Sequence, residues 1–215
     1  MMVVELFSLK LNGSFRMKTT FLILFLVSTS FALSINDSLL KIHATLLPKV
    51  YLMDYNFKNK IQNKTIVIAI LYSNTTYQSA KSLKEKIEAR YPNGINKYKI
   101  VSKLVSYKKL ATTQANIFYM LPASHELIEK SVKYAQKELA LTFAYDKKDL
   151  NYGVMISLNI SKKIKPILNL KALKINEIEM RPMLINISLI FTYSKSSIIE
   201  RMQHESFNFI QVYSA

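Results

Sequence analysis

Cysteine is absent from this chain of 215 residues. Disulfide bonds, thiolate metal ligands and cysteine nucleophiles are therefore excluded. Glycine is also scarce, with three residues, so the chain cannot form a glycine-rich phosphate-binding loop. The G-x-S-x-G signature of serine hydrolases is missing as well. The low glycine and proline content argues against a low-complexity chain, and a hydrophobic share of one half argues against a disordered one.

Arginine is rare although the chain is strongly basic, with a formal net charge of +16. Nearly all of the positive charge comes from lysines that are scattered along the sequence. Dedicated recognition of phosphates or bases favours arginine forks, so we expect no nucleic-acid partner. The basic balance is compatible with weak contact to an anionic surface, such as lipid head groups or an acidic protein face. Compositional drift towards lysine, isoleucine and asparagine is the alternative explanation.

The beginning of the chain has the pattern of a secretory signal. Met17 and Lys18 precede the apolar run of residues 21–27, and small residues flank Phe31 at Ser30 and Ala32. This pattern predicts cleavage after Ala32. A membrane anchor is the alternative, but the run is shorter than the ~20 residues that span a bilayer. Removal of residues 1–32 leaves 27 basic and 13 acidic residues, a net charge of +14.

These boundaries predict three parts. Residues 1–32 comprise an upstream extension and the signal peptide, residues 33–191 form one α/β domain, and residues 192–215 are a tail for which a helix is one alternative. The signal predicts an exported protein, and the length is sufficient for a hydrophobic core of its own.

Apolar periodicity predicts alternating strands and helices in the first part of the domain. The β-branched run 65–72 is typical of a strand covered on both faces, and residues 77–90 show one apolar stripe of a helix. Further strands are expected at 98–105, 117–121 and 141–145, with a helix after Ser124. Residues 38–55 have helical spacing, which Pro48 is expected to break or kink, so that residues 50–55 pack on as a second piece.

The last part of the domain predicts a hairpin followed by two helices. Residues 154–160 alternate between apolar and polar, and residues 164–168 form the return strand, which Pro166 places at a sheet edge. A short helix is expected at 170–178. The final helix begins at Pro182 and should face inward with these side chains: Met183, Leu184, Ile187, Leu189 and Ile190. The predicted fold class is therefore α/β, a single domain with a mixed β-sheet, helices on both faces and a closing antiparallel hairpin.

No catalytic, cofactor-binding or metal-binding residue emerges from the sequence. His43, His125 and His204 lack ligand spacing, and no carboxylate cluster accompanies them. We therefore expect a protein that is not an enzyme and uses no cofactor. Several tyrosines follow predicted strands or helices and could line one rim, which would suit a protein interface or a small ligand cleft. Plain core packing is the alternative for these six: Tyr51, Tyr55, Tyr72, Tyr107, Tyr145 and Tyr152.

Several segments together resemble the YfiR-like family of bacterial periplasmic regulatory proteins. They are LLKIHATLL, TIVIAILY, IFYML, LALTFAY, YGVMISLN, IKPILNLKALKI and RPMLINI, and the resemblance covers residues 38–191. The strongest match is a glycine before the hairpin (Gly153), an asparagine after the return strand (Asn169), the alanine that follows (Ala172), and a leucine-rich last helix (Met183, Leu184).

The resemblance implies a small periplasmic α/β protein without catalytic activity. Such a protein would bind the periplasmic domain of a membrane-embedded signalling partner, such as a diguanylate cyclase or a sensor kinase, and modulate it. Many relatives carry disulfides linked to redox state, which the lack of cysteine excludes here. A homodimer is an option that the family suggests. The alternative function is a periplasmic small-solute-binding module with a cleft at the strand ends.

Overall fold

The run predicted as a buried strand forms β1 (Thr65–Tyr72), which lies inside a seven-stranded sheet. The structure, a computed structural model, describes residues 35–193. The strand order is β2-β1-β3-β4-β5-β6-β7. The remaining strands are β2 (Lys99–Ser106), β3 (Ile117–Met120), β4 (Leu141–Ala144), β5 (Ile156–Ile160), β6 (Ile164–Leu168) and β7 (Leu189–Ile190). All neighbours pair in parallel except β5 and β6, which form the predicted antiparallel hairpin.

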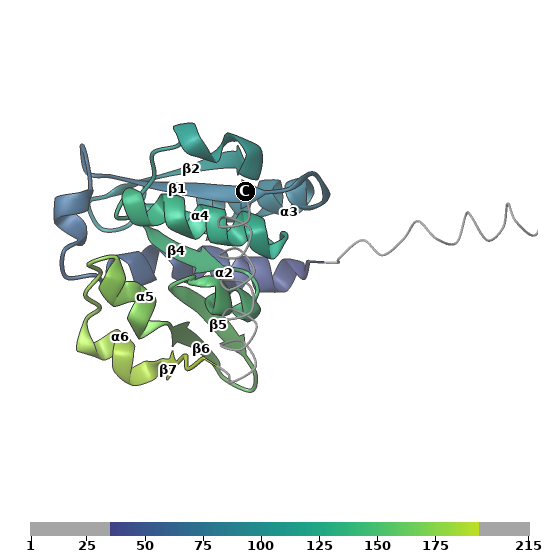
Figure 1. Ribbon diagram of the computed structural model, residues 1–215. Coiled ribbons are helices and arrows are strands. Elements are labelled where there is room, and N and C mark those ends of the chain that lie inside the picture. Colours follow the sequence, from purple (N-terminus) through teal and green to yellow (C-terminus); the bar gives the residue numbers. More distant parts are fainter. Residues whose placement is uncertain (1–34, 194–215) are drawn as a thin grey trace, which may run out of the picture. The chain divides into compact units, whose positions relative to one another are not determined.

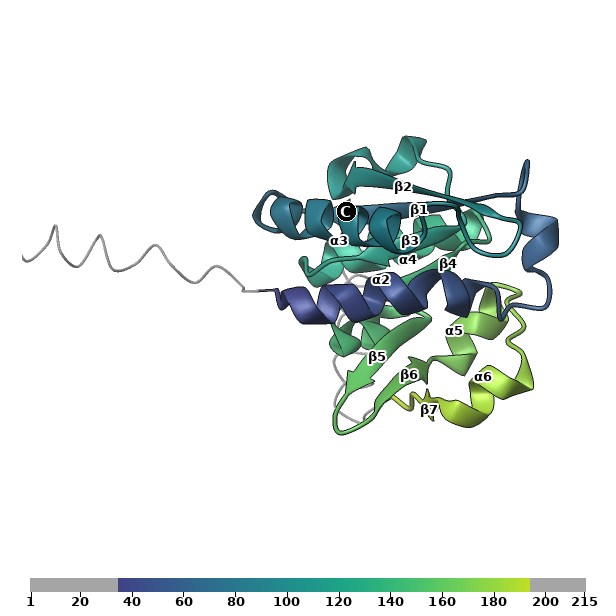
Figure 2. The same cartoon turned by 180° about the vertical axis from the view of Figure 1, so that it is seen from behind.

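Helices cover both faces of this sheet. The helices α2 (Asp37–Tyr51) and α3 (Tyr77–Arg90) lie on the face seen in Figure 2, and α4 (His125–Lys137) lies on the face seen in Figure 1. Two short helices, α5 (Leu170–Ile175) and α6 (Pro182–Ile187), follow the hairpin. The predicted fold class, α/β with a mixed sheet and a closing hairpin, is confirmed.

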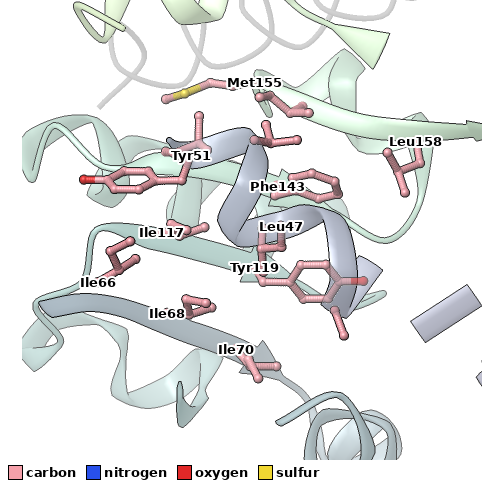
Figure 3. Close-up of a cluster of buried hydrophobic side chains, with 14 of the residues drawn as sticks. Leu47, Tyr51, Ile66, Ile68, Ile70, Ile117, Tyr119, Phe143, Met155 and Leu158 are labelled. Atoms are coloured by element: carbon pink, nitrogen blue, oxygen red, sulfur yellow. The ribbon is translucent and has the colours of Figure 1, made fainter. Parts of the chain in front are cut away.

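The alternation of side chains along β1 divides the core into two layers. Ile66, Ile68 and Ile70 point towards α2 and belong to the larger cluster, together with Tyr119 and Phe143 (Figure 3). The intervening residues contribute instead to a second cluster beneath α4, whose members include Ala69, Leu71, Phe118, Met120 and Ile128. A strand buried on both faces is therefore hydrophobic at every position, as its sequence indicated.

Helix α2 passes through Pro48 without the predicted break. The helix begins at the Asn36 cap, whose side chain accepts from the Leu39 N–H at 3.1 Å, and continues to Tyr51. Proline removes one helical hydrogen bond, which usually ends or kinks a helix. Here Leu47 and Tyr51 on either side of Pro48 are almost completely buried against the sheet. The burial of this apolar face offsets the lost hydrogen bond, so the expectation of a second piece at residues 50–55 is wrong.

The C-terminal elements are shorter than predicted. Helix α5 ends at Ile175, and α6 buries Leu184 but leaves Met183 and Ile187 exposed. The chain then extends into β7, so the prediction that residues 183–190 form one inward-facing helix is wrong. A six-residue helix is too short to present a full apolar stripe, and pairing with β6 satisfies the backbone that follows.

The hairpin itself is confirmed, with one correction. Ile160, expected to face the core, is 47% exposed because it lies at the hairpin tip. Pro166 was expected at a sheet edge or with its position facing outward, and it does lie in the part of β6 that is a free edge, because β7 pairs only with Ile167 and Leu168. The missing proline N–H therefore lies just outside the paired stretch.

Replacement of Gly94 by alanine is expected to cost about 1–3 kcal/mol of stability. Gly94 has a φ of +78° in the turn before β2, and an added Cβ would collide with the backbone carbonyl of Tyr98. Asn93→Ala, at an exposed neighbour, is the control and should change stability by less than about 0.5 kcal/mol. Urea unfolding of both variants measures the difference. Equal stabilities would show that the turn rearranges freely.

Candidate functional site

The strand order reverses direction between β1 and β3. From β1 the chain crosses to β2 on one side, whereas β3 to β5 follow on the other. In open α/β sheets such a switch point opens a crevice at the carboxyl ends of the strands, where ligands bind. The segments that follow β1 and β3 at this edge are therefore where the fold favours a binding site.

Polar groups directly after β1 are used by the fold itself. The Ser73 backbone N–H donates to the Thr76 hydroxyl at 2.9 Å, and the Ser73 hydroxyl lies 3.1 Å from the same oxygen. The Ser73 hydroxyl also lies 2.9 Å from the hydroxyl of Thr75. This arrangement is a capping box that starts the helical segment leading to α3. The hydroxyls are thus engaged with one another.

Aromatic rings surround this carboxyl edge. Tyr72, at the end of β1, packs against Tyr77 at the start of α3 with ring centroids 5.1 Å apart. His125, at the start of α4, stacks on Tyr152 at 5.8 Å. Tyr145, directly after β4, accepts a hydrogen bond from the Asn36 N–H at 3.0 Å. We call these five residues the carboxyl rim: Tyr72, Tyr77, His125, Tyr145 and Tyr152.

The rim corrects the expected set of tyrosines. Tyr107 also follows a strand, but it is buried, and its hydroxyl donates to the Leu121 carbonyl at 2.6 Å. Tyr51 and Tyr55 lie at the opposite, amino edge of the sheet, where the Tyr55 N–H donates to the Glu179 carbonyl. Tyr77 and His125 were not predicted as rim residues, because the tyrosine pattern concerned the ends of strands. These two residues instead begin helices that return from the same edge.

A buried carboxyl group lies next to the rim. Asp149 is 8% exposed, and its Oδ2 makes no hydrogen bond within residues 35–193. Burial, with a smaller contribution from the charge of Asp146, raises the pKa of Asp149 to about 7. Within the described part of the chain, no three histidine, aspartate or glutamate side chains come together as a metal site. Asp149 is therefore a buried acid whose charge is influenced by Asp146 and whose Oδ2 has no hydrogen-bond donor among the described residues.

The three histidines lie in different surroundings. His43 is buried, its Nδ1 lies 2.9 Å from the Tyr119 hydroxyl, and its ring stacks on Tyr145. Burial lowers the pKa of His43 to about 3, so its ring is neutral in the folded protein. His125 is exposed on the rim, and His204 lies outside the described residues. The structure brings no two of the described histidines together.

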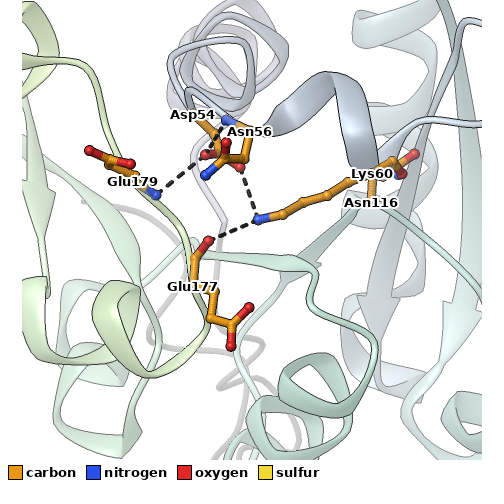
Figure 4. Close-up of polar contacts among 6 residues, drawn as sticks. All are labelled: Asp54, Asn56, Lys60, Asn116, Glu177 and Glu179. Atoms are coloured by element: carbon orange, nitrogen blue, oxygen red, sulfur yellow. Dashed lines mark hydrogen bonds and ion pairs between the residues drawn. The ribbon is translucent and has the colours of Figure 1, made fainter.

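The amino edge carries a compact polar cluster centred on Asp54 (Figure 4). The Asp54 carboxylate accepts from the backbone N–H of Asn56 at 3.0 Å and from that of Glu179 at 3.3 Å. The Lys60 ammonium lies 3.0 Å from its other oxygen and also donates to the Glu177 carbonyl at 3.3 Å.

Asn116 extends the cluster towards β1 and β3. Its side chain donates to the Lys60 carbonyl at 2.6 Å and accepts from the Val67 N–H at 2.8 Å. We call the cluster the Asp54 clasp: Asp54, Asn56, Lys60, Asn116 and the backbone of residues 177–179. It joins the end of α2 to the loop between α5 and α6, and its polar groups are engaged within the fold.

A groove of about 410 Å³ lies on the outer face between α4 and the 3-10 helix η4 (Tyr107–Thr112). Leu110, Ala111 and Tyr134 line it, and its charged residues carry both signs. The groove lies away from the sheet's switch point, and none of its charged side chains forms an ion pair with another described residue. No helix among residues 35–193 is long and apolar enough to cross a bilayer.

Comparison with known proteins identifies the fold and no family. No protein-family model and no curated protein matches the chain. A conserved domain protein from Vibrio cholerae O1 biovar El Tor, known from its crystal structure, is similar with a TM-score of 0.52 and 11% identity. The similarity covers 71% of this chain and 60% of that chain. At this identity, the likeness shows a shared α/β fold.

A second solved structure is more distant. It is the ABC domain from Streptococcus pneumonia in complex with L-Trp, with a TM-score of 0.46 and 11% identity, covering 72% of this chain and 61% of that one. The chain thus spans about three fifths of the length of both solved structures.

Proposed function

We propose that this chain is a non-catalytic periplasmic regulatory protein that binds and modulates a membrane-embedded signalling partner. A diguanylate cyclase or a sensor kinase, contacted through its periplasmic domain, is the kind of partner that the resemblance to YfiR-like proteins implies. The observation that carries the proposal is the carboxyl rim, an aromatic edge whose neighbouring hydroxyl groups already bind one another.

An aromatic edge of this kind suits a protein interface. Tyrosine is enriched where proteins bind one another because its ring contributes large contact area at low conformational cost. Tyr77 is 40% exposed and is supported from behind by Tyr72. A regulator that binds one state of its partner more tightly shifts the partner's equilibrium without performing any reaction.

The residues that carry the family resemblance have structural roles here. Gly153 adopts a φ of +90° where the 3-10 helix η5 (Lys147–Tyr152) ends before β5. The Asn169 side chain accepts from the Ala172 N–H at 3.1 Å and donates to the Leu150 carbonyl at 3.2 Å. It thereby caps α5 and ties it to η5. These contacts explain why such residues would recur in a family whose members share a fold and no reaction.

The second candidate function is a periplasmic module for a small solute. The switch point between β1 and β3 favours it, because solutes bind at this position in related sheet topologies. The two functions use the same edge, so they are distinguished by what binds there, a membrane protein or a metabolite.

The decisive experiment is a crosslinked pull-down from the cell envelope with the wild type, Tyr77→Ala and Tyr55→Ala. Tyr55 is 49% exposed at the amino edge, which makes Tyr55→Ala the matched control. We expect the wild type and the control to recover an inner-membrane signalling protein, and Tyr77→Ala to recover roughly tenfold less, as for an interface hot spot.

Equal recovery by all three proteins would show that the rim is not the interface. If no signalling protein is recovered and a metabolite raises the melting temperature of the wild type, the solute-binding function is correct instead.

A further inference from the structure

Exposed apolar side chains concentrate at the end of the sheet formed by β6 and β7. Eight of the eleven large hydrophobic residues exposed in the described part of the chain lie between residues 160 and 190. Six of them belong to the hairpin tip, α6 and β7, which follow one another along the lower edge of the ribbon in Figure 1, with α6 and the hairpin tip at its two ends. We call these six the β7-side surface: Ile160, Ile164, Met183, Ile187, Leu189 and Ile190.

The strand register explains how this surface arises from the core. Ile156 and Leu168 are paired across the hairpin and buried, and the next pair outward, Leu158 and Pro166, is also buried. Ile160 and Ile164 form the outermost pair of the same row, and both are exposed. The row of core side chains thus continues past the helices that cover it and ends uncovered at the hairpin tip.

The same stretch of chain carries an excess of positive charge. Lys162, Lys163 and Lys165 lie on the hairpin, and Lys171, Lys174 and Arg181 lie on and after α5. Acidic side chains between residues 160 and 190 are limited to Glu177 and Glu179. None of the six cations is within ion-pair distance of a described carboxylate, whereas on α3 Lys84 pairs with Glu88 at 2.7 Å. Unpaired lysines occur elsewhere in the described part of the chain as well, so what distinguishes this stretch is that its cations lie beside exposed apolar side chains.

We propose that the β7-side surface docks on an anionic lipid bilayer. Apolar side chains interleaved with lysines are the composition of segments that lie in a membrane interface, where the apolar groups enter the head-group layer and the ammonium groups reach lipid phosphates. Ile160 and Ile164 flank the lysines of the hairpin tip, which lets both kinds of group reach the bilayer together. The lysines carry no fixed fork geometry, which suits a fluid layer of head groups.

Charge argues against the two other occupants of this surface. A second copy of the chain would bring the same excess of cations into contact with itself, which is repulsive. Residues 194–215, which follow directly after β7, contain two basic and two acidic side chains, so they offer no net negative charge. An anionic bilayer supplies the complementary charge that both of these occupants lack.

Docking on lipid rests on the proposed function and extends it. The two are nevertheless tested by different experiments. Strand β5 ends at Ile160, on the same edge of the sheet as the carboxyl rim, so contact through the hairpin tip holds the rim close to the lipid surface. The periplasmic domain of a membrane-embedded partner would likewise lie close to the lipid surface. Vesicles contain no protein, so failure to bind vesicles and failure to recover a partner are separate results.

The test is cosedimentation of the full chain with phosphatidylcholine vesicles that either contain or lack phosphatidylglycerol. Three variants are compared with the wild type: Lys162→Gln/Lys163→Gln, Ile160→Ser/Ile164→Ser, and the control Lys130→Gln/Lys133→Gln. The control removes the same charge from exposed lysines of α4. All proteins share residues 1–34, so differences between them report the exchanged side chains alone.

We expect the wild type to bind the anionic vesicles, with affinity that falls as salt is added. Each of the two hairpin variants should bind roughly tenfold more weakly, and the control should stay within about twofold of the wild type. Because the exchanged side chains are exposed, the melting temperatures of the variants should remain close to that of the wild type. If Ile160→Ser/Ile164→Ser does not melt cooperatively, Ile164→Ser alone takes its place.

Several outcomes would overturn the proposal. Equal weakening by the two lysine pairs would show that binding follows overall charge, and equal binding to both vesicle types would show that the anionic lipid has no role. A wild-type dimer that Ile160→Ser/Ile164→Ser converts to a monomer would assign the surface to a second copy. Faster hydrogen exchange at residues 160–164 in a chain ended after Tyr193 would assign it to residues 194–215.

Discussion

Replacement of Asp54 by alanine is expected to lower the free energy of unfolding by about 3–5 kcal/mol. Asp54 is 1% exposed, and its carboxylate binds two backbone N–H groups and the Lys60 ammonium. Removal of the carboxylate leaves the lysine charge without its partner in a largely buried position and leaves the N–H groups of Asn56 and Glu179 unsatisfied. Broken buried ion pairs are costly because the remaining charge has lost its solvation and gained nothing in return.

Urea unfolding at neutral pH measures this loss, and two further variants show its origin. Asp54→Asn keeps an acceptor for the backbone but removes the charge, so its loss should be smaller than that of Asp54→Ala. Glu88→Ala breaks the exposed Lys84–Glu88 pair on α3 and should cost less than about 1 kcal/mol. A loss below 1 kcal/mol for Asp54→Ala would mean that the Asp54 clasp does not hold α2 to the α5–α6 loop.

The second large effect concerns Asp149 and its dependence on pH. Burial raises the pKa of Asp149 to about 7 in the folded protein, from 3.8 in the unfolded chain. The folded state therefore binds the proton more tightly, and the stability from this group is complete below pH 3.8 and lost as the pH rises through 7. Between pH 4 and pH 8, Asp149→Asn, which cannot ionise, should consequently gain about 4 kcal/mol relative to the wild type.

His43 acts in the opposite direction. Burial lowers the pKa of His43 to about 3 in the folded protein, compared with 6.5 in the unfolded chain. The unfolded state binds the proton first, so stability falls by about 1.4 kcal/mol for each pH unit below 6.5. Between pH 3.8 and 6.5 the contributions of His43 and Asp149 therefore nearly cancel in the wild type.

This cancellation is testable by urea unfolding across pH 4 to 8. Relative to the wild type, Asp149→Asn should become steadily less stable as the pH falls below 6.5, and His43→Gln should become steadily more stable. His125→Gln, at an exposed histidine, is the control for the exchange of histidine for glutamine itself. Parallel curves for all four proteins would show that neither buried group has a different pKa in the folded and unfolded states.

Local patterns in the sequence predicted the elements that one stretch of chain can specify alone. The continuous run at 65–72 reports burial on both faces, and the stripe at 77–90 reports one buried helical face, so β1 and α3 appear as expected. The alternation at 154–160 with a short connection predicted the hairpin for the same reason. Each of these signals arises from side chains that neighbour one another in the chain.

Signals that depend on distant partners were not available from the sequence. Pro48 reads as a helix breaker until the sheet buries the turn of α2 on either side of it. Residues 189–190 read as helix until β6 offers them a strand to pair with. The Asp54 clasp joins residues 125 positions apart, and no local pattern marks Glu179 as its partner.

The sequence by itself determined the fold class, the parallel and antiparallel parts of the sheet, and the exclusion of thiol chemistry, because composition and periodicity are properties of the chain alone. The tertiary structure decided which aromatic side chains meet at the carboxyl rim, which acid is buried without a partner, and where apolar and basic side chains share one uncovered surface. These features depend on which elements lie side by side. That arrangement follows from the sum of many weak contacts across the whole domain, and no single segment of the sequence contains it.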